Sequence, residues 1–184
     1  MRVRGLLLPL ALVLTLVGSA SASTIASRTE LLLTLEHLPQ DFRIAKPGRV
    51  VSARVERQSY GVNTARFGRL TGVHVSFKRE VTDFTDRALN QVDIGLIFFR
   101  SAGRAHRAFE ALSAKERTLF AVHVGAESVG SGLSGPDVNV RWVWWRHKNV
   151  VANMTGSYFF GHPNVRSLVE LARAQQSRLA RSVR

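Results

Sequence analysis

Apolar and polar residues alternate with a period of two along several stretches, and this pattern constrains the fold more than any other feature. The alternation is clear at 73–77. It appears again at 92–99, where the second half of the segment is apolar on both faces. Residues 138–146 alternate again, and 150–159 follow them after a short polar break. Period-two patterning is typical of β-strands, and short connections favour antiparallel pairing. The pattern therefore predicts an antiparallel sheet with a hairpin near the C-terminus.

Helical periodicity appears between and after these strands. Ser101 is a good N-cap for a helix that runs to about Glu116, and a long final helix begins at about residue 162. A short helix is expected over 28–37, while 42–55 is expected to be extended. Together these elements predict an α+β fold, with an antiparallel sheet of about five strands, helices packed on it and a long C-terminal helix.

The first 22 residues have the three parts of a secretory signal peptide. Arg2 and Arg4 precede an apolar run over 6–17, and Ala20-Ser21-Ala22 places cleavage before Ser23. The apolar run is shorter than the roughly 20 residues that span a bilayer, which favours removal over retention as an anchor. Residues 23–184 are expected to form one exported domain.

Composition excludes several classes of protein. The chain has 184 residues and no cysteine, so it contains no disulfide scaffold, thiolate metal site or cysteine nucleophile. Six histidines are scattered without metal-ligand spacing, so neither a metal nor a cofactor is expected. The sequence 130–135 matches G-x-G-x-x-G, but a strand follows it where a dinucleotide site needs a helix, so 124–137 is expected to be a mobile loop.

The net charge of +13 comes mostly from arginine. Such a composition is typical of a GC-rich bacterial genome, but arginine also suits bidentate binding of phosphate or carboxylate. The densest basic group lies on the final helix, at Arg166, Arg173, Arg178, Arg181 and Arg184. A polyanion or anionic lipid could bind there, whereas no motif supports nucleic acid.

Aromatic residues concentrate in the last hairpin and suggest a binding site. Trp142 and Trp144 share one face of the strand, and core packing is their expected role. Arg141, Val143 and Trp145 share the opposite face. If helices cover only one face of the sheet, these three form an exposed platform suited to a sugar ring, a planar ligand or a partner's loop.

Two carboxylates are the candidates for chemistry. Asp93 lies on the expected central strand, and Glu127 lies in the expected loop, where it could also bind a ligand. A cleft joining either acid to a histidine would favour a hydrolase. The chain contains no Gly-x-Ser-x-Gly elbow for a serine nucleophile.

Several short segments resemble a group of uncharacterised secreted α/β domains of actinobacteria and related bacteria. They are 33–42, 66–72, 124–128 and 149–151, together with an alanine-rich final helix containing Gln175 and Gln176. Some relatives are lipoproteins or extracellular sensor domains of membrane kinases. The resemblance implies a free, exported, noncatalytic domain, and it carries over no catalytic residues.

These observations yield one leading hypothesis and two alternatives. The leading hypothesis is a secreted, noncatalytic binding or accessory domain at the bacterial cell envelope. The alternatives are an exported hydrolase without a recognisable motif, and a polyanion or anionic-lipid binder acting through the C-terminal helix. The sequence identifies neither the ligand nor a protein partner.

Overall fold

A computed structural model describes residues 28–80, 88–159 and 163–182 of the chain. The expected signal peptide over 1–22, its cleavage site before Ser23, and Arg184 all lie outside the described residues.

Six antiparallel strands form one sheet, in the spatial order β1-β2-β3-β6-β5-β4. Their bounds are β1 (Phe42–Val51), β2 (Arg69–Arg79), β3 (Leu89–Phe99), β4 (Glu127–Ser134), β5 (Val138–His147) and β6 (Val150–Phe159). The α+β class is confirmed, and β3 and β6 are the central strands. The sheet has six strands, in agreement with the prediction of about five.

The additional strand is β4, which was predicted to be a loop. Its glycines and serines hide the strand in the sequence, yet it pairs with β5 without a register shift from Glu127 to Ser134. Gly130 lies against the Phe120 ring, and a Cβ there would come within 2.6 Å of a ring carbon. The glycine therefore lets residues 119–120 pack against this edge of the sheet, with Leu119 donating its backbone N–H to the Gly130 carbonyl.

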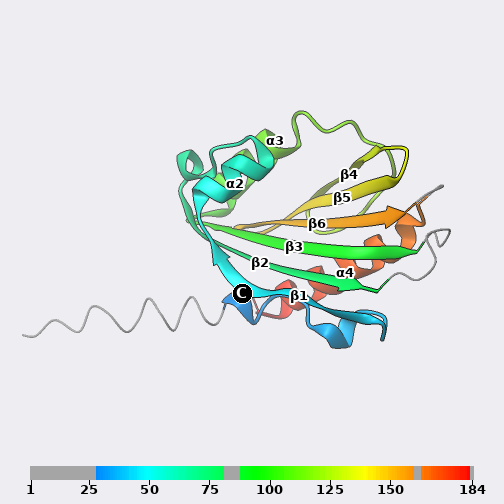
Figure 1. Ribbon diagram of the computed structural model, residues 1–184. Helices are drawn as coiled ribbons and strands as arrows, with labels where there is room; N and C mark the ends of the chain where they lie inside the picture. The colour runs from blue at the N-terminus through cyan, green and yellow to red at the C-terminus, as the bar shows by residue number, and fades with distance from the viewer. Residues whose placement is uncertain (1–27, 81–87, 160–162, 183–184) are drawn as a thin grey trace, which may run out of the picture.

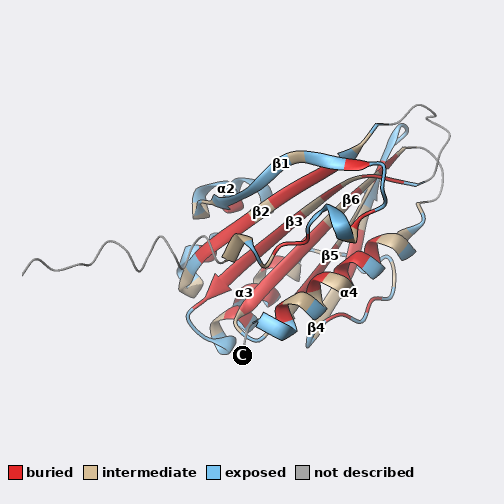
Figure 2. Cartoon of the chain, turned by 90° about the horizontal axis from the view of Figure 1, so that it is seen from below, coloured by how far each residue is buried: buried red, intermediate tan, exposed pale blue. Residues whose placement is uncertain are grey.

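Helices cover the two faces of the sheet unequally. The helices α2 (Ala53–Tyr60) and α3 (Ala102–Ser113) lie over one end of one face (Figure 1). The long helix α4 (Val165–Ser182) and the segment 28–41 cover the other face, seen from below in Figure 2. We call these the α2/α3 face and the α4 face.

Two local predictions were wrong. The helix expected over 28–37 is present only as a fragment at its start and a short 3-10 turn, η1 (Leu35–His37). Residues 53–60 form α2, although extended chain and loop were expected there. Ser52 caps this helix by accepting a hydrogen bond from the Val55 N–H, and Gly61 ends it in the left-handed conformation at φ 68°.

A buried glutamine joins the N-terminal segment to α4. The Gln175 side chain is fully buried; its Oε1 accepts from the Leu33 N–H at 3.0 Å, and its Nε2 donates to the Leu31 carbonyl at 2.7 Å. The amide thus satisfies two backbone groups that no strand or helix pairs. Leu32 and Leu33 are held in the core by this contact.

Replacing Gln175 with leucine should destabilise the protein by about 2 kcal/mol, because two backbone groups would be buried without hydrogen bonds. Urea unfolding followed by circular dichroism measures the change. Arg173→Ala, at an exposed position of the same helix, should stay within about 0.5 kcal/mol of the parent. Equal effects of the two substitutions would contradict the role assigned to Gln175.

Candidate functional site

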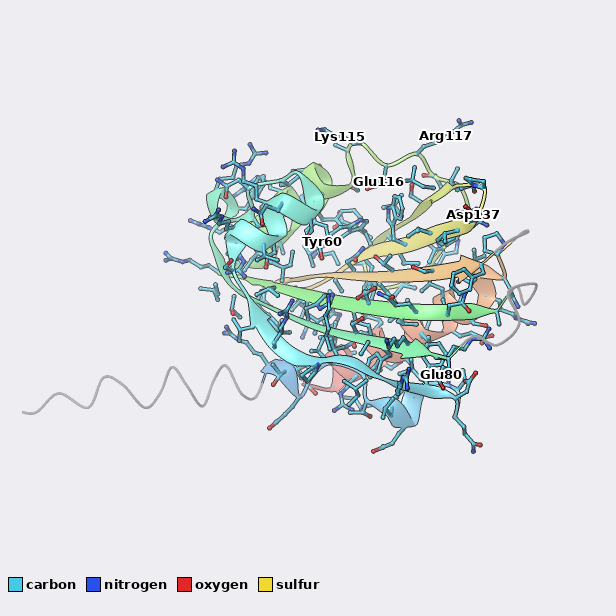
Figure 3. The ribbon with its side chains drawn as sticks, viewed as in Figure 1. Tyr60, Glu80, Lys115, Glu116, Arg117 and Asp137 are labelled. Atoms are coloured by element: carbon cyan, nitrogen blue, oxygen red, sulfur yellow. The ribbon has the colours of Figure 1, made fainter. Side chains whose placement is uncertain are left out.

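A cleft lies on the part of the α2/α3 face that the helices leave open. Two adjoining hollows of about 250 Å³ and about 290 Å³ form it, and both are lined by Ser59 and Tyr60 at the end of α2. Figure 3 shows Tyr60 beneath α2 and Glu116 beneath the connection that follows α3, both on this side of the sheet. We call the two hollows together the upper cleft.

The strand registers arrange this face of the sheet in two rows, and the members of these rows other than Ser76, Ser131 and Val129 form the cleft floor. From β1 to β4 the first row is Lys46, Ser76, Asp93, Thr155, Trp142 and Ser131. The second row is Arg49, His74, Gly95, Asn153, Trp144 and Val129. Each row begins with a basic residue on β1, passes through hydrogen-bonding groups and reaches a tryptophan on β5. The floor is therefore polar at one end and aromatic at the other.

The end wall of the cleft is positioned by a buried ion pair. Glu56 of α2 is 2% exposed, and its carboxylate accepts two hydrogen bonds from the Arg69 guanidinium, each at 2.7 Å. Thr64 of the 3-10 turn η2 (Thr64–Phe67) donates a third bond at 2.6 Å, and Arg69 also donates to the Val51 carbonyl. Tyr60 lies one helical turn beyond Glu56, so the ion pair fixes the position of the Tyr60 ring.

The polar end contains an imidazole and a carboxylate. His74 Nε2 lies 3.6 Å from Asp93 Oδ1, and Gln91 donates to the other Asp93 oxygen at 2.6 Å. Burial lowers the pKa of His74; Asp93 opposes this effect, while Arg49 and Lys46 reinforce it. The ring is therefore neutral near pH 7, and the two exposed β1 cations leave this end with net positive charge.

The aromatic end is held rigidly by contacts at its rim. The Trp142 indole N–H donates to Glu116 Oε2 at 2.8 Å. Trp144 packs edge-on against Tyr60, with ring centroids 4.8 Å apart and planes at 80°. Trp144 is buried and Trp142 is partly exposed, so Trp142 offers an aromatic surface to a molecule in the cleft.

The predicted platform of Arg141, Val143 and Trp145 is wrong as an exposed surface. Val143 and Trp145 have no exposed area, because α4 covers their face of β5, and Trp145 donates its indole N–H to Gln176. Arg141 is half-buried, and its guanidinium binds the Leu133 carbonyl and the Ser134 hydroxyl of β4. The sequence pairs these residues on one face correctly, but that face lies under the helix.

Glu127 connects three elements at the start of β4. Its carboxylate contacts His106 Nδ1 of α3 at 2.6 Å and also binds Arg146 of β5. Burial would raise the pKa of Glu127, but hydrogen bonds and positive charges from Arg146 and His106 outweigh it and lower that pKa. This arrangement ties α3 to the sheet, and Glu127 does not line the upper cleft.

Asp93 meets a histidine in a cleft, which is the arrangement that would favour a hydrolase. The other His74 nitrogen, Nδ1, is buried, and no hydrogen-bond partner reaches it within the described residues. In that part of the chain, no serine or threonine hydroxyl is therefore hydrogen-bonded to His74 Nδ1. The same residues contain no group of three histidines or acids able to hold a metal ion.

The arginines of α4 are partly engaged. Arg166 pairs with Glu170 at 3.4 Å, and Arg178 donates to the Glu30 carbonyl. Arg173 and Arg181 are exposed on the same helix. In the described part of α4, Arg173 and Arg181 have no ion-pair partner, and Arg178 keeps its positive charge because the Glu30 carbonyl is neutral.

Three residues of the cleft are not predicted from the sequence, namely Tyr60, Asn153 and Thr155, and the strand pattern assigns Trp142 only to the core. A usable signal was present in β6, where Asn153, Thr155 and Ser157 alternate with residues that face the core. A polar stripe on a central strand indicates a face that stays accessible. Tyr60 could not be found in this way, because its helix was predicted as a loop.

Comparisons with known proteins bear on the fold. No protein-family model matches the chain, and its sequence matches no curated protein. The crystal structure of the extracellular domain of PknH from Mycobacterium tuberculosis matches 84% of this chain and 95% of its own, with a TM-score of 0.51 and 10% identity. At this identity the likeness to the PknH domain establishes a shared fold. In the described ranges of the chain, no helix has the length and apolarity needed to cross a membrane.

Stability should depend on pH through His74. In the unfolded chain His74 binds a proton near pH 6.5, whereas in the folded protein it does so only at a lower pH. Protonation of His74 therefore favours the unfolded state. Stability should therefore fall as pH decreases below about 6.5, by up to about 1.4 kcal/mol per pH unit. His74→Gln should flatten this decrease in urea unfolding curves measured between about pH 7.5 and about pH 5. The same flattening in His123→Gln, at an exposed site, would contradict the assignment.

The three tryptophans should differ in accessibility. Trp142→Phe should remove most of the quenching of tryptophan fluorescence by acrylamide, because Trp144 and Trp145 are 3% and 0% exposed. Trp145→Phe removes a shielded fluorophore, so the accessible fluorescence should keep the quenching constant that it has in the parent. Strong quenching that persists in Trp142→Phe would show that the cleft assignment is wrong.

Proposed function

We propose that the protein is an exported, noncatalytic binding domain of the bacterial cell envelope, and that the upper cleft holds a small polar molecule carrying a ring. The expected signal peptide supports export, and the fold shared with a kinase extracellular domain is consistent with it. The observation that carries the proposal is the cleft floor, where Thr155 and Asn153 lie directly beside Trp142 and Trp144.

This arrangement suits a saccharide unit. A partly exposed indole provides a flat surface for the apolar face of a sugar ring, and hydroxyl and amide groups beside it bind the ring substituents. The Glu116 contact fixes the Trp142 ring before the ligand arrives, which reduces the entropy lost on binding. A linear apolar ligand would cover Asn153, Thr155 and Asp93 without adding to the hydrogen bonds that they already make with protein groups.

Calorimetric titration with soluble muropeptides and with neutral and uronic-acid oligosaccharides tests the proposal. At least one probe should bind, and both Trp142→Leu and Thr155→Val should weaken its binding at least about tenfold. Ser177→Ala on the α4 face is the matched control and should bind like the parent, since its hydroxyl contacts only its own helix. Absence of binding by every probe, or binding unaffected by both cleft variants, would reject the proposal.

A hydrolase remains the second candidate, because Asp93, His74 and the Tyr60 and Ser59 hydroxyls line one hollow. The same mixtures can be analysed by chromatography for cleaved products. Turnover that His74→Gln abolishes, without loss of binding, would favour the hydrolase over the binding domain. Intact probes after long incubation would favour the binding domain.

A further inference from the structure

Positive charge gathers at one end of the sheet. Six arginines lie around α2, η2 and the start of α3, where Figure 3 shows many nitrogen-tipped side chains. They are Arg54, Arg57, Arg66, Arg100, Arg104 and Arg107, and we call them the basic pole. All are exposed except Arg104, which is half-buried.

The fold brings these arginines together from separate stretches of sequence. The Arg100 N–H donates to the Gly68 carbonyl at 3.2 Å, which joins the start of α3 to η2. The Arg104 side chain lies over Gly68, where a Cβ would meet its guanidinium at 2.2 Å. Helix α2 packs against η2 in turn, with Glu56 bonded to Thr64. The basic pole is therefore a single rigid surface.

The basic pole differs from the opposite end of the sheet in its ion pairing. Within the described residues, no acidic side chain pairs with any of its six arginines. The nearby acids are engaged elsewhere: Glu56 is buried and bonded to Arg69, Glu110 contacts His106 at 3.5 Å, and Glu127 contacts His106 and Arg146. At the other end, Arg43 pairs with Glu80 at 2.7 Å and Arg79 with Asp41 at 3.3 Å. The six arginines of the basic pole therefore keep their positive charge uncompensated by any ion pair in the described ranges.

Apolar side chains are exposed beside the arginines. Val50 at the end of β1, Val55 in α2 and Leu70 at the start of β2 are 46%, 42% and 46% exposed. A soluble polyanion requires only the charges, whereas a lipid surface binds both arginines and apolar side chains that enter the headgroup region. The described chain also begins at this end, since the Arg28 guanidinium lies 5.1 Å above the Phe98 ring.

We propose that the basic pole docks the protein on an anionic lipid surface, with the arginines on headgroup phosphates and Val50, Val55 and Leu70 at the headgroup boundary. None of the six arginines lines the upper cleft, and the surface meets the cleft only at Val55, which lines one of its hollows. The surface is separate from the arginines of α4. It relocates the lipid-binding alternative from the C-terminal helix to the α2–η2–α3 end of the molecule. The proposal is independent of what the upper cleft binds.

Vesicle cosedimentation of the purified protein tests this surface, using phosphatidylcholine vesicles with and without phosphatidylglycerol. Phosphatidylglycerol should increase the partitioning of the parent onto vesicles. For the triple variant Arg54→Gln, Arg57→Gln, Arg107→Gln this increase should be about 100-fold smaller. The matched variant Arg166→Gln, Arg173→Gln, Arg181→Gln removes the same charge from α4 and should lose less than about fivefold. Glutamine preserves helix propensity, and circular dichroism checks that both variants fold.

The salt dependence of vesicle binding and an apolar variant test the proposal further. Partitioning of the parent should fall steeply between about 50 mM and about 500 mM NaCl, because exposed charges are screened. Leu70→Ser should weaken vesicle binding without changing binding to soluble polyphosphate. Three outcomes would each overturn the proposal: equal losses of vesicle binding in the two triple variants, no increase in binding with anionic lipid, or binding to polyphosphate without binding to vesicles.

Discussion

The buried contact between Glu56 and Arg69 is the constraint on which the α2/α3 face depends. A carboxylate that is 2% exposed must be compensated, and here a bidentate guanidinium and the Thr64 hydroxyl satisfy it. Gly72 makes the contact possible, because a Cβ at that position would lie 2.0 Å from the Glu56 carboxylate. The pair anchors an eight-residue helix that is too short to be stable alone. Through Tyr60 it sets the end wall of the upper cleft, and through η2 it joins the elements of the basic pole.

Unequal coverage of the two faces follows from the lengths of the helices. The 18-residue α4 and the segment that Gln175 binds to it bury the α4 face along most of its length. The 8-residue α2 and 12-residue α3 reach only one end of the other face. Adjacent tryptophans consequently have different environments. Trp145 is enclosed beneath α4, Trp144 packs on Tyr60, and Trp142 lies at the edge of helix coverage.

Much of the fold is predictable from local pattern, because period-two alternation survives wherever one strand face is buried. That signal identifies β2, β3, β5 and β6, and helical spacing identifies α3 and α4. It fails for β4, whose glycines and serines resemble a loop until Phe120 and β5 pack against them. It fails also for α2, whose mostly polar sequence is stabilised by one buried ion pair with a residue 13 positions away.

The candidate site is less predictable than the fold for a different reason. Alternation separates Trp142 and Trp144 from Val143 and Trp145, but it does not reveal which set a helix will cover. That choice depends on where α4 docks, and Gln175 and Gln176 make contacts with residues far away in sequence.

The effect of the charged residues is also set by contacts between residues distant in sequence. Composition gives a count of arginines, but their effect depends on pairing: Arg43, Arg69 and Arg146 are neutralised by acids, whereas the basic pole is not. The clustering of six unpaired arginines at the basic pole, rather than the number of arginines in the chain, is therefore what gives this end of the molecule its charged surface.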